Sequence, residues 1–187
     1  IPILNPLLTV LRGNEIESIM GILNGTTNYI LTQMTDFGLD FEAVLKTAQE
    51  KGFAEADPTA DVEGIDVANK LSILMAIAFD KYVKPQDIKT TGITGITKQD
   101  IENAKSKGAK IKLVAGAKKL ANGELEYEVG PMEIADDHPL ASVSNEFNAV
   151  FLKGNAVDEL MFYGKGAGPL PTGSAVVGDL IDIALRI

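Results

Sequence analysis

The sequence predicts an α+β fold, in which a mixed β-sheet carries its helices packed on one face. One early strand-like segment is followed by three segments with helical spacing of apolar residues, between residues 26 and 79. Strand signals then dominate residues 110–163, and helices followed by a run of strands are typical of this class. The chain has 187 residues, of which 45% are apolar, so we assign residues 1–187 to one domain with a core of its own.

The first half of the chain contains the predicted helices. Residues 16–23 are rich in β-branched and apolar side chains and are typical of a strand. The turn and capping signal N-G-T-T-N follows, and helices are expected over residues 26–36, 41–51 and 65–79. The last of these is apolar on every side in its second half, which indicates burial.

The second half begins with a polar helix expected over residues 98–107. Four strands are expected after it, at residues 110–118, 124–130, 145–152 and 158–163. The sequence A-N-G at residues 121–123 predicts a hairpin between the first two, because Asn-Gly supplies the positive φ angles of a tight turn. A final helix is expected over residues 172–187.

Composition excludes several classes of function. Seventeen basic and 26 acidic residues give a net charge of −9, which argues against a nucleic-acid partner. The absence of cysteine excludes disulfides, thiolate catalysis and cysteine-based zinc sites, and the single histidine, His138, leaves no histidine cluster. The longest uncharged apolar run, residues 71–79, is too short to span a membrane, and without a visible signal peptide we expect a cytoplasmic protein.

Both ends of the sequence have the pattern of a longer chain. The first residues, I-P-I-L-N-P, lack an initiator methionine, and the last, I-D-I-A-L-R-I, continue a helical pattern. We therefore expect a fragment of a larger protein.

The most unusual stretch is E-A-D-P-T-A-D-V-E-G-I-D-V-A-N-K, residues 55–70, which precedes an apolar helix. Asp66 and Lys70 are four residues apart and share a helix face, and Asp61 stands where an N-cap is expected. A capped helix with a surface ion pair explains this pattern. A binding site explains it too, because several acids beside one lysine at the edge of a core suit a substrate that carries an ammonium group.

Three motifs carry a resemblance to a known family. They are G-I-L-N-G-T-T-N-Y-I-L-T-Q-M, then G-F-A-E-A-D-P-T-A-D-V-E-G-I-D-V-A-N-K-L-S-I-L, then G-K-G-A-G-P-L-P-T-G-S-A-V-V-G-D-L. In this order, and over nearly the whole chain, they resemble homoserine dehydrogenase. The resemblance implies reduction of L-aspartate 4-semialdehyde to L-homoserine with NADPH or NADH, in threonine, methionine and isoleucine biosynthesis.

The resemblance covers the region that follows the family's nucleotide-binding domain. No G-x-G-x-x-G after a strand occurs in the sequence, so the matched part is the substrate-binding, catalytic and dimerisation region. The final helix, about residues 170–187, would return to the missing Rossmann domain. A sheet face left uncovered would favour a homodimer with two-fold symmetry.

The resemblance also implies roles for the residues of the acidic stretch. Lys70 corresponds to the family's catalytic lysine, which handles the proton of the reacting oxygen. Glu55 and Asp66 correspond to acids that hold the ammonium group of the substrate, and Asp61 has a supporting role beside them.

Further positions are implied to line the same pocket. Gly52 lies where the chain passes close to substrate or cofactor, and Thr26 faces the pocket, although a threonine here can simply cap a helix. Gly166 and Gly168 match the glycine-rich turn that meets the nicotinamide nucleotide, although a strand-to-helix turn explains these glycines as well. A sodium ion is implied near the domain junction, held mostly by upstream groups, with the carbonyl of Ile1 as the candidate ligand.

Two hypotheses of different classes follow. The chain is either the catalytic and dimerising part of an NAD(P)-dependent oxidoreductase, inactive when isolated, or a stand-alone amino-acid-binding or dimerisation module without hydride transfer. An upstream dinucleotide fingerprint would favour the first.

Overall fold

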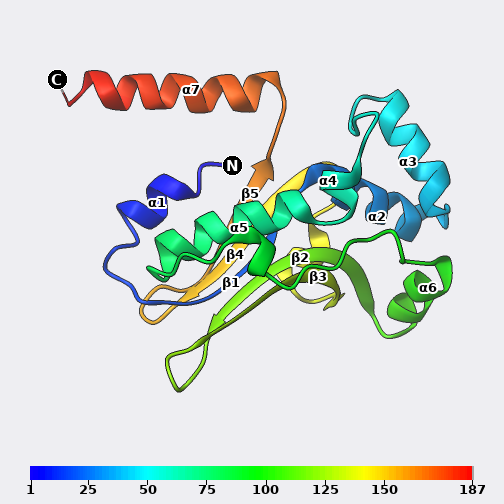
Figure 1. The fold of residues 1–187 in the computed structure, drawn as a ribbon, viewed down its shortest axis with the longest axis horizontal. Coiled ribbons are helices and arrows are strands. Elements are labelled where there is room, and N and C mark those ends of the chain that lie inside the picture. The colour runs from blue at the N-terminus through cyan, green and yellow to red at the C-terminus, as the bar shows by residue number, and fades with distance from the viewer. Residues whose placement is uncertain (187) are drawn as a thin grey trace.

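A five-stranded antiparallel sheet forms the centre of the molecule, in a computed structural model that describes residues 1–186 (Figure 1). Strand β1 lies in the middle between β2 and β4, and β3 and β5 form the edges. The bounds are β1 Ile16–Ile22, β2 Ala109–Lys119, β3 Leu125–Ala135, β4 Phe147–Gly154 and β5 Asp158–Lys165.

Seven α-helices and two 3-10 turns are described around this sheet. Helices α1 and α5 lie across its length, and α2, α3 and α6 gather at one end (Figure 1). The bounds are α1 Leu4–Leu8, α2 Gly25–Phe37, α3 Phe41–Glu50, α4 Thr59–Val62, α5 Ile65–Ala78, α6 Lys98–Ser106, α7 Pro169–Ala184, η1 Pro85–Asp87 and η2 Pro139–Ser142.

The α+β class with helices on one face is confirmed, but the pairing within the sheet is not mixed. All four pairs of named strands are antiparallel, and parallel pairing is confined to a bridge between Thr90 and Val129. Two of these pairs, β2–β3 and β4–β5, are hairpins and so must be antiparallel, whereas β1 pairs with β2 and β4 across long connections. The predicted hairpin at residues 121–123 is present, with Gly123 at a φ of +86°.

Two short helices were not predicted. Helix α1 follows Pro2 and contains Pro6, and it is held by the burial of Ile3, Leu7 and Leu11 in and beside it against the core rather than by its own propensity. Helix α4 is a turn of helix inside the acidic stretch of residues 55–70. Both are single turns that periodicity cannot identify.

The core lies in two layers, one on each face of the sheet. The larger layer packs β1 and β2 against α2 and α5, with Ile19, Ile30, Leu71 and Met75 almost fully buried. The expectation that α5 is buried on every side is wrong at Ile73, which is 50% exposed. The smaller layer lies under η2 on the opposite face, around Ile22, Val114, Leu140, Val143 and Phe151.

Helix α7 differs from the other helices because none of its residues is buried. It extends away from the sheet after β5 (Figure 1), and it exposes an apolar surface that includes Leu170, Val176, Leu180 and Ile183. The predicted helix at the C-terminus is thus present up to Ala184, and Ile187 lies outside the described residues. That α7 returns to another domain stays a prediction.

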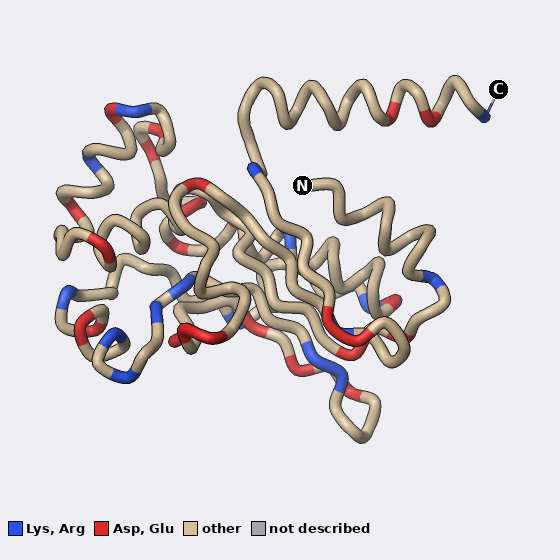
Figure 2. Tube along the Cα trace, turned by 180° about the vertical axis from the view of Figure 1, so that it is seen from behind, with Lys and Arg blue, Asp and Glu red and all other residues tan. Residues whose placement is uncertain are grey.

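Charged residues are spread over most of the molecule, with acidic and basic positions interspersed along the trace (Figure 2). No helix among residues 1–186 has the length and apolar character needed to cross a bilayer.

Candidate functional site

Ile22, Leu23 and Asn24, at and just after the end of β1, form hydrogen bonds with side chains from several other parts of the chain. The carbonyl of Ile22 accepts a hydrogen bond from Asn148 Nδ2 at 3.1 Å. The carbonyl of Leu23 accepts one from Lys70 Nζ at 3.0 Å. The side chain of Asn24 donates to two carboxylates, so the end of the central strand is the point where these segments meet.

Asn24 connects the acidic stretch to the sheet. It is the N-cap of α2, where its Oδ1 accepts from the backbone N–H of Thr27 at 2.9 Å. Its Nδ2 donates to Asp61 Oδ1 at 2.7 Å and to Asp66 Oδ2 at 3.0 Å. Sequence reasoning missed this residue. The capping signal was visible, but its bonds to residues 37 and 42 positions away in the chain were not.

Lys70 and Asp66 form the predicted pair on one face of α5. Their charged atoms are 2.6 Å apart, and the side chains are 47% and 30% exposed. An isolated surface pair of this spacing contributes little to stability. Here both members are also held by β1 and its extension, through Leu23 and Asn24, so the ammonium group has a fixed position that is still open to solvent.

Asp61 belongs to the cluster that Asn24, Asp66 and Lys70 form at the end of β1, but not in the way predicted. The expectation that it caps the following helix is wrong, because the N-cap of α5 is Gly64 and Asp61 lies within α4. The single turn of α4 moves the carboxylate back toward Asn24. The substrate-supporting role of Asp61 stays a prediction.

Glu55 is not brought next to Lys70 in this structure. Its side chain is exposed and takes part in no ion pair among residues 1–186, and its backbone carbonyl accepts from Gln49 Nε2 at 3.1 Å. Of the two acids implied to hold the ammonium group of the substrate, Asp66 is the one that pairs with Lys70. Glu55 lies on the segment between α3 and α4, and its part in holding a substrate stays a prediction.

Thr26 contacts the turn that contains Gly52. The buried Thr26 hydroxyl donates to the carbonyl of Phe53 at 2.7 Å and so fixes the turn that contains Gly52, whose φ is +74°. Thr26 does not cap α2, because the N-cap is Asn24, and the neighbouring Thr27 hydroxyl donates to Asn24 Oδ1 at 3.0 Å. The contact gives Thr26 a structural task, and its place in a substrate pocket stays a prediction.

Gly166 lies beside the same end of β1 because of Asn148. A Cβ atom at position 166 would be 2.1 Å from Asn148 Oδ1, so only glycine allows this close approach. Since Asn148 also donates to Ile22, the turn after β5 is held close to the end of β1, where the next carbonyl, that of Leu23, accepts from Lys70. Gly168 follows as the N-cap of α7, at a φ of +119°.

Ile1, the candidate sodium ligand, lies just before α1 and beside β5. The carbonyl of Ile1 accepts the N–H of Ile3 at 3.0 Å, and the side chain packs close to Gly164. No cluster of three or more carboxylate or imidazole groups suited to a metal occurs among residues 1–186. A site built from backbone carbonyls needs no such cluster, so the Ile1 assignment, with most of the sodium ligands upstream, stays a prediction.

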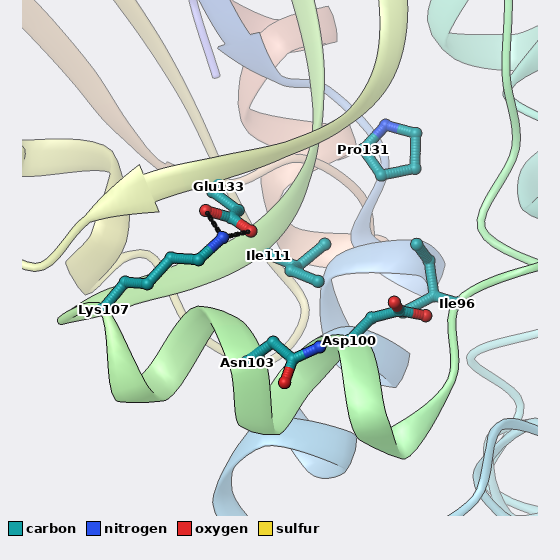
Figure 3. A pocket seen from close by; sticks show the side chains of 7 residues that line it. All are labelled: Ile96, Asp100, Asn103, Lys107, Ile111, Pro131 and Glu133. Atoms are coloured by element: carbon teal, nitrogen blue, oxygen red, sulfur yellow. Dashed lines mark hydrogen bonds and ion pairs between the residues drawn. The ribbon is translucent and has the colours of Figure 1, made fainter.

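A surface hollow of about 260 Å³ lies between α6 and the β2–β3 hairpin, away from this cluster (Figure 3). Lys107 and Glu133 form an ion pair across one end of it, at 2.7 Å. The carboxylate of Asp100 already caps α6 together with Thr97, and these hydrogen bonds lower the Asp100 pKa. No predicted site residue lines the hollow, so the candidate site is the cluster at the end of β1. The lining residues are Ile96, Asp100, Asn103, Lys107, Ile111, Pro131 and Glu133.

The fold and this cluster define an α+β domain in which a lysine and two carboxylates gather at the end of the central strand. The family model for homoserine dehydrogenase matches residues 2–181. The chain belongs to the homoserine dehydrogenase family.

Individual relatives agree with this assignment. The homoserine dehydrogenases of Synechocystis sp. and Bacillus subtilis are 50% and 48% identical to the chain, each over 98% of it. A crystal structure of a homoserine dehydrogenase from Thiobacillus denitrificans has a TM-score of 0.94 and 46% identity over 98% of the chain and 42% of that structure. A putative homoserine dehydrogenase from Archaeoglobus fulgidus has a TM-score of 0.90 and 38% identity over 97% of the chain and 55% of that structure. The chain spans only 43% and 42% of the first two relatives.

Proposed function

We propose that this chain is the substrate-binding and catalytic part of a homoserine dehydrogenase, which reduces L-aspartate 4-semialdehyde to L-homoserine with NADPH or NADH. The observation that carries the proposal is the position of Lys70. Its amine is held by Asp66 and by the Leu23 carbonyl at the end of the central strand, with one side open to solvent. Family membership favours this function over a binding module without hydride transfer.

The residues of the cluster suit the proton chemistry of this reaction. A nicotinamide bound beside this cluster would supply the hydride for the aldehyde carbon. Lys70 donates a proton to the aldehyde oxygen as negative charge develops there, and in the reverse direction its amine accepts the hydroxyl proton of homoserine. Asp66 keeps the lysine side chain in place through the 2.6 Å contact.

The carboxylates provide the orientation of the substrate. The ammonium group of the substrate is separate from the carbonyl carbon that reacts. Asp66 and Glu55 are the acids proposed to bind the ammonium group. Asn24 and Asp61 hold Asp66 in its position, directly or through the shared amide. Fixing the ammonium group sets the distance between the carbonyl carbon and the hydride donor, which is a proximity contribution to the rate.

The nucleotide is proposed to meet this chain at the turn from Gly166 to Gly168. The absence of side chains on both glycines and the closeness of Gly166 to β1 suit a flat ring that approaches the backbone. The larger part of the nucleotide site is proposed to lie in residues outside these 187, together with the determinants of NADP or NAD preference and any sodium ligands.

Self-association is proposed to use the face of the sheet opposite the helices. That face is covered by η2 over only part of its area, and it leaves Met20, Met161 and Tyr163 wholly or partly exposed. Burial of these side chains against a second copy would favour a homodimer, which sedimentation equilibrium would detect. A cytoplasmic location and a place in threonine, methionine and isoleucine biosynthesis likewise stay predictions from the family.

Replacing Lys70 tests the proposal in the complete enzyme that carries these residues. Lys70→Met should lower kcat for homoserine oxidation by about 100-fold or more, because the proton acceptor is removed. Lys89→Met is the matched control. Lys89 is not part of the site, and its Nζ forms an exposed ion pair with Glu128 Oε2 at a distance of 2.9 Å. Retention of more than half of the wild-type kcat by Lys70→Met would contradict the proposal. Binding of homoserine by the 187-residue chain with no dehydrogenase activity in the complete protein would favour the binding module.

A further inference from the structure

Lys112 is a buried lysine that the proposed reaction does not use. It lies on β2 with 2% of its surface exposed. Its Nζ donates to Asn28 Oδ1 at 3.1 Å and to the carbonyl of Val143 at 2.6 Å. It forms no ion pair within the described residues 1–186, so an amine that is costly to bury is retained here for its hydrogen bonds.

The hydrogen bonds of Lys112 decide how the amide of Asn28 is turned. A lysine amine in its charged form can only donate, so it must face the oxygen of the amide. Asn28 Nδ2 is then directed toward the 143–147 segment, which joins η2 to β4. It donates to the carbonyls of Asn145 and Phe147 at 2.9 and 3.0 Å, and to that of Val143 at 3.3 Å.

The 143–147 segment packs directly on the first turns of α2. The N–H of Asn145 donates to Thr32 Oγ1 at 3.0 Å. The carbonyl of Glu146 approaches Gly25 so closely that a Cβ there would be 2.9 Å from its oxygen. Residues 25 to 32 of α2 are therefore clamped from the side of β4, and the residue that precedes them is Asn24.

We infer that Lys112 is a positioning residue for the cluster at the end of β1. Through Asn28 it holds the 143–147 segment against the start of α2, and so it fixes Asn24, which in turn binds Asp61 and Asp66. The catalytic consequence rests on the proposed function, whereas the mechanical coupling does not. Lys112 itself touches neither Lys70 nor the carboxylates.

Hydrogen exchange in the 187-residue chain tests the coupling without any assay of activity. In Lys112→Met the amides of Thr27 and Asn145 should exchange at least about tenfold faster, because their acceptors, Asn24 and Thr32, lose their fixed positions. The amides in the centre of β1 should keep their wild-type rates. Methionine fills nearly the same volume as lysine, so the change removes the donor with little loss of packing.

Lys110→Met is the matched control for this experiment. Lys110 lies two residues away on the same strand and donates to the carbonyl of Ala141 at 3.4 Å, without reaching Asn28. This variant should leave both amides unchanged. Equal acceleration of all amides in Lys112→Met, or unchanged rates at Thr27 and Asn145, would overturn the inference. If Lys112→Met does not fold, Asn28→Asp is judged by the same two amides, because it keeps an acceptor for Lys112 and removes the donor to the segment.

Kinetics of the complete enzyme separate this inference from the proposed function. Lys112→Met should lower kcat/KM for homoserine by about tenfold or more, because the carboxylates are misplaced, and leave the KM for the nucleotide within about twofold. Lys110→Met should keep both values. Faster exchange with unchanged kcat/KM would overturn the positioning role. A wild-type enzyme without dehydrogenase activity would instead contradict the proposed function, and the exchange data would still decide the coupling.

Discussion

At the scale of single residues, Asn24 determines whether the acidic stretch is a set of surface charges or an organised site. One side-chain amide satisfies the start of α2 with its oxygen and two carboxylates with its nitrogen. The sequence identified Asp66 and Lys70 from their spacing, because a helix places residues four apart on one face. It could not identify the residue that ties them to β1, since that contact depends on how α4, α5 and β1 pack together.

Asn24→Asp should destabilise the protein at neutral pH although it keeps an acceptor for the α2 N-cap. The substitution removes the donor to Asp61 and Asp66 and places a third carboxylate beside them, for a loss of about 2 kcal/mol in the free energy of unfolding. Urea unfolding measures this, and Asn24→Ser, which keeps a cap without adding charge, is the control. Equal stability of Asn24→Asp and the wild type at pH 7 would contradict the described contacts.

Lys112 predicts a pH dependence of stability whose sign follows from its environment. Burial, with a smaller effect of Lys110, lowers the Lys112 pKa from 10.5 to about 8, against an opposing effect of Asp36. Below pH 8 the proton is bound in both the folded and the unfolded chain. Between pH 8 and 10.5 the unfolded chain binds it and the folded chain does not, so this residue makes the free energy of unfolding rise with pH.

The comparison of wild type with Lys112→Met isolates this contribution. From pH 8 to 10.5 the free energy of unfolding of the wild type should rise by on the order of 3 kcal/mol relative to that of Lys112→Met. Other lysines and tyrosines titrate in both proteins and cancel. Denaturant titrations at several pH values in this window provide the measurement, and parallel stability curves would show that Lys112 has an ordinary pKa.

At the scale of elements, the helices and strands that the sequence predicted are those with a strong period or a marked end. Helix α2 begins after its capping asparagine, and the β2–β3 hairpin turns at Asn122–Gly123. The two short helices α1 and α4 depend on tertiary contacts, so no local signal could predict them. The antiparallel order of the sheet was also out of reach, because pairing partners are chosen by packing over long distances in the chain.

The turn between β5 and α7 shows the same dependence on a distant contact. Gly166→Ala would place a methyl group 2.1 Å from Asn148 Oδ1, so Asn148 must move and lose its hydrogen bond to Ile22. We expect a loss of about 1 to 3 kcal/mol in the free energy of unfolding, as for other overpacked positions. Gly173→Ala is the control, because nothing lies within 4 Å of the added Cβ and alanine is the better helix former. A Gly166→Ala protein as stable as the control would contradict the close contact between residues 148 and 166.

At the scale of the whole molecule, the buried core and the exposed apolar surface lie in different parts of the chain. The sheet, α2 and α5 contribute the buried core, and the helical face is closed by α1 through Ile3, Leu7 and Leu11. Helix α7 contributes no buried residue and carries much of the exposed apolar surface. Such a surface is typical of a contact with another domain or chain. Under the proposed function, the partner of α7 is the nucleotide-binding domain.

Removal of residues 169–187 should therefore leave the cooperative unfolding of the remaining domain nearly unchanged. Because α7 buries nothing against the sheet, we expect the Tm to change by less than about 2 °C and solubility to improve as apolar surface is removed. Removal of residues 1–13 is the control, since it takes away a shorter segment that nevertheless buries Ile3, Leu7 and Leu11, and it should lower the Tm strongly. Differential scanning calorimetry of the two truncated chains makes the comparison. If the first truncation lowers the Tm as much as the second, α7 stabilises the domain directly and its exposed face has another explanation.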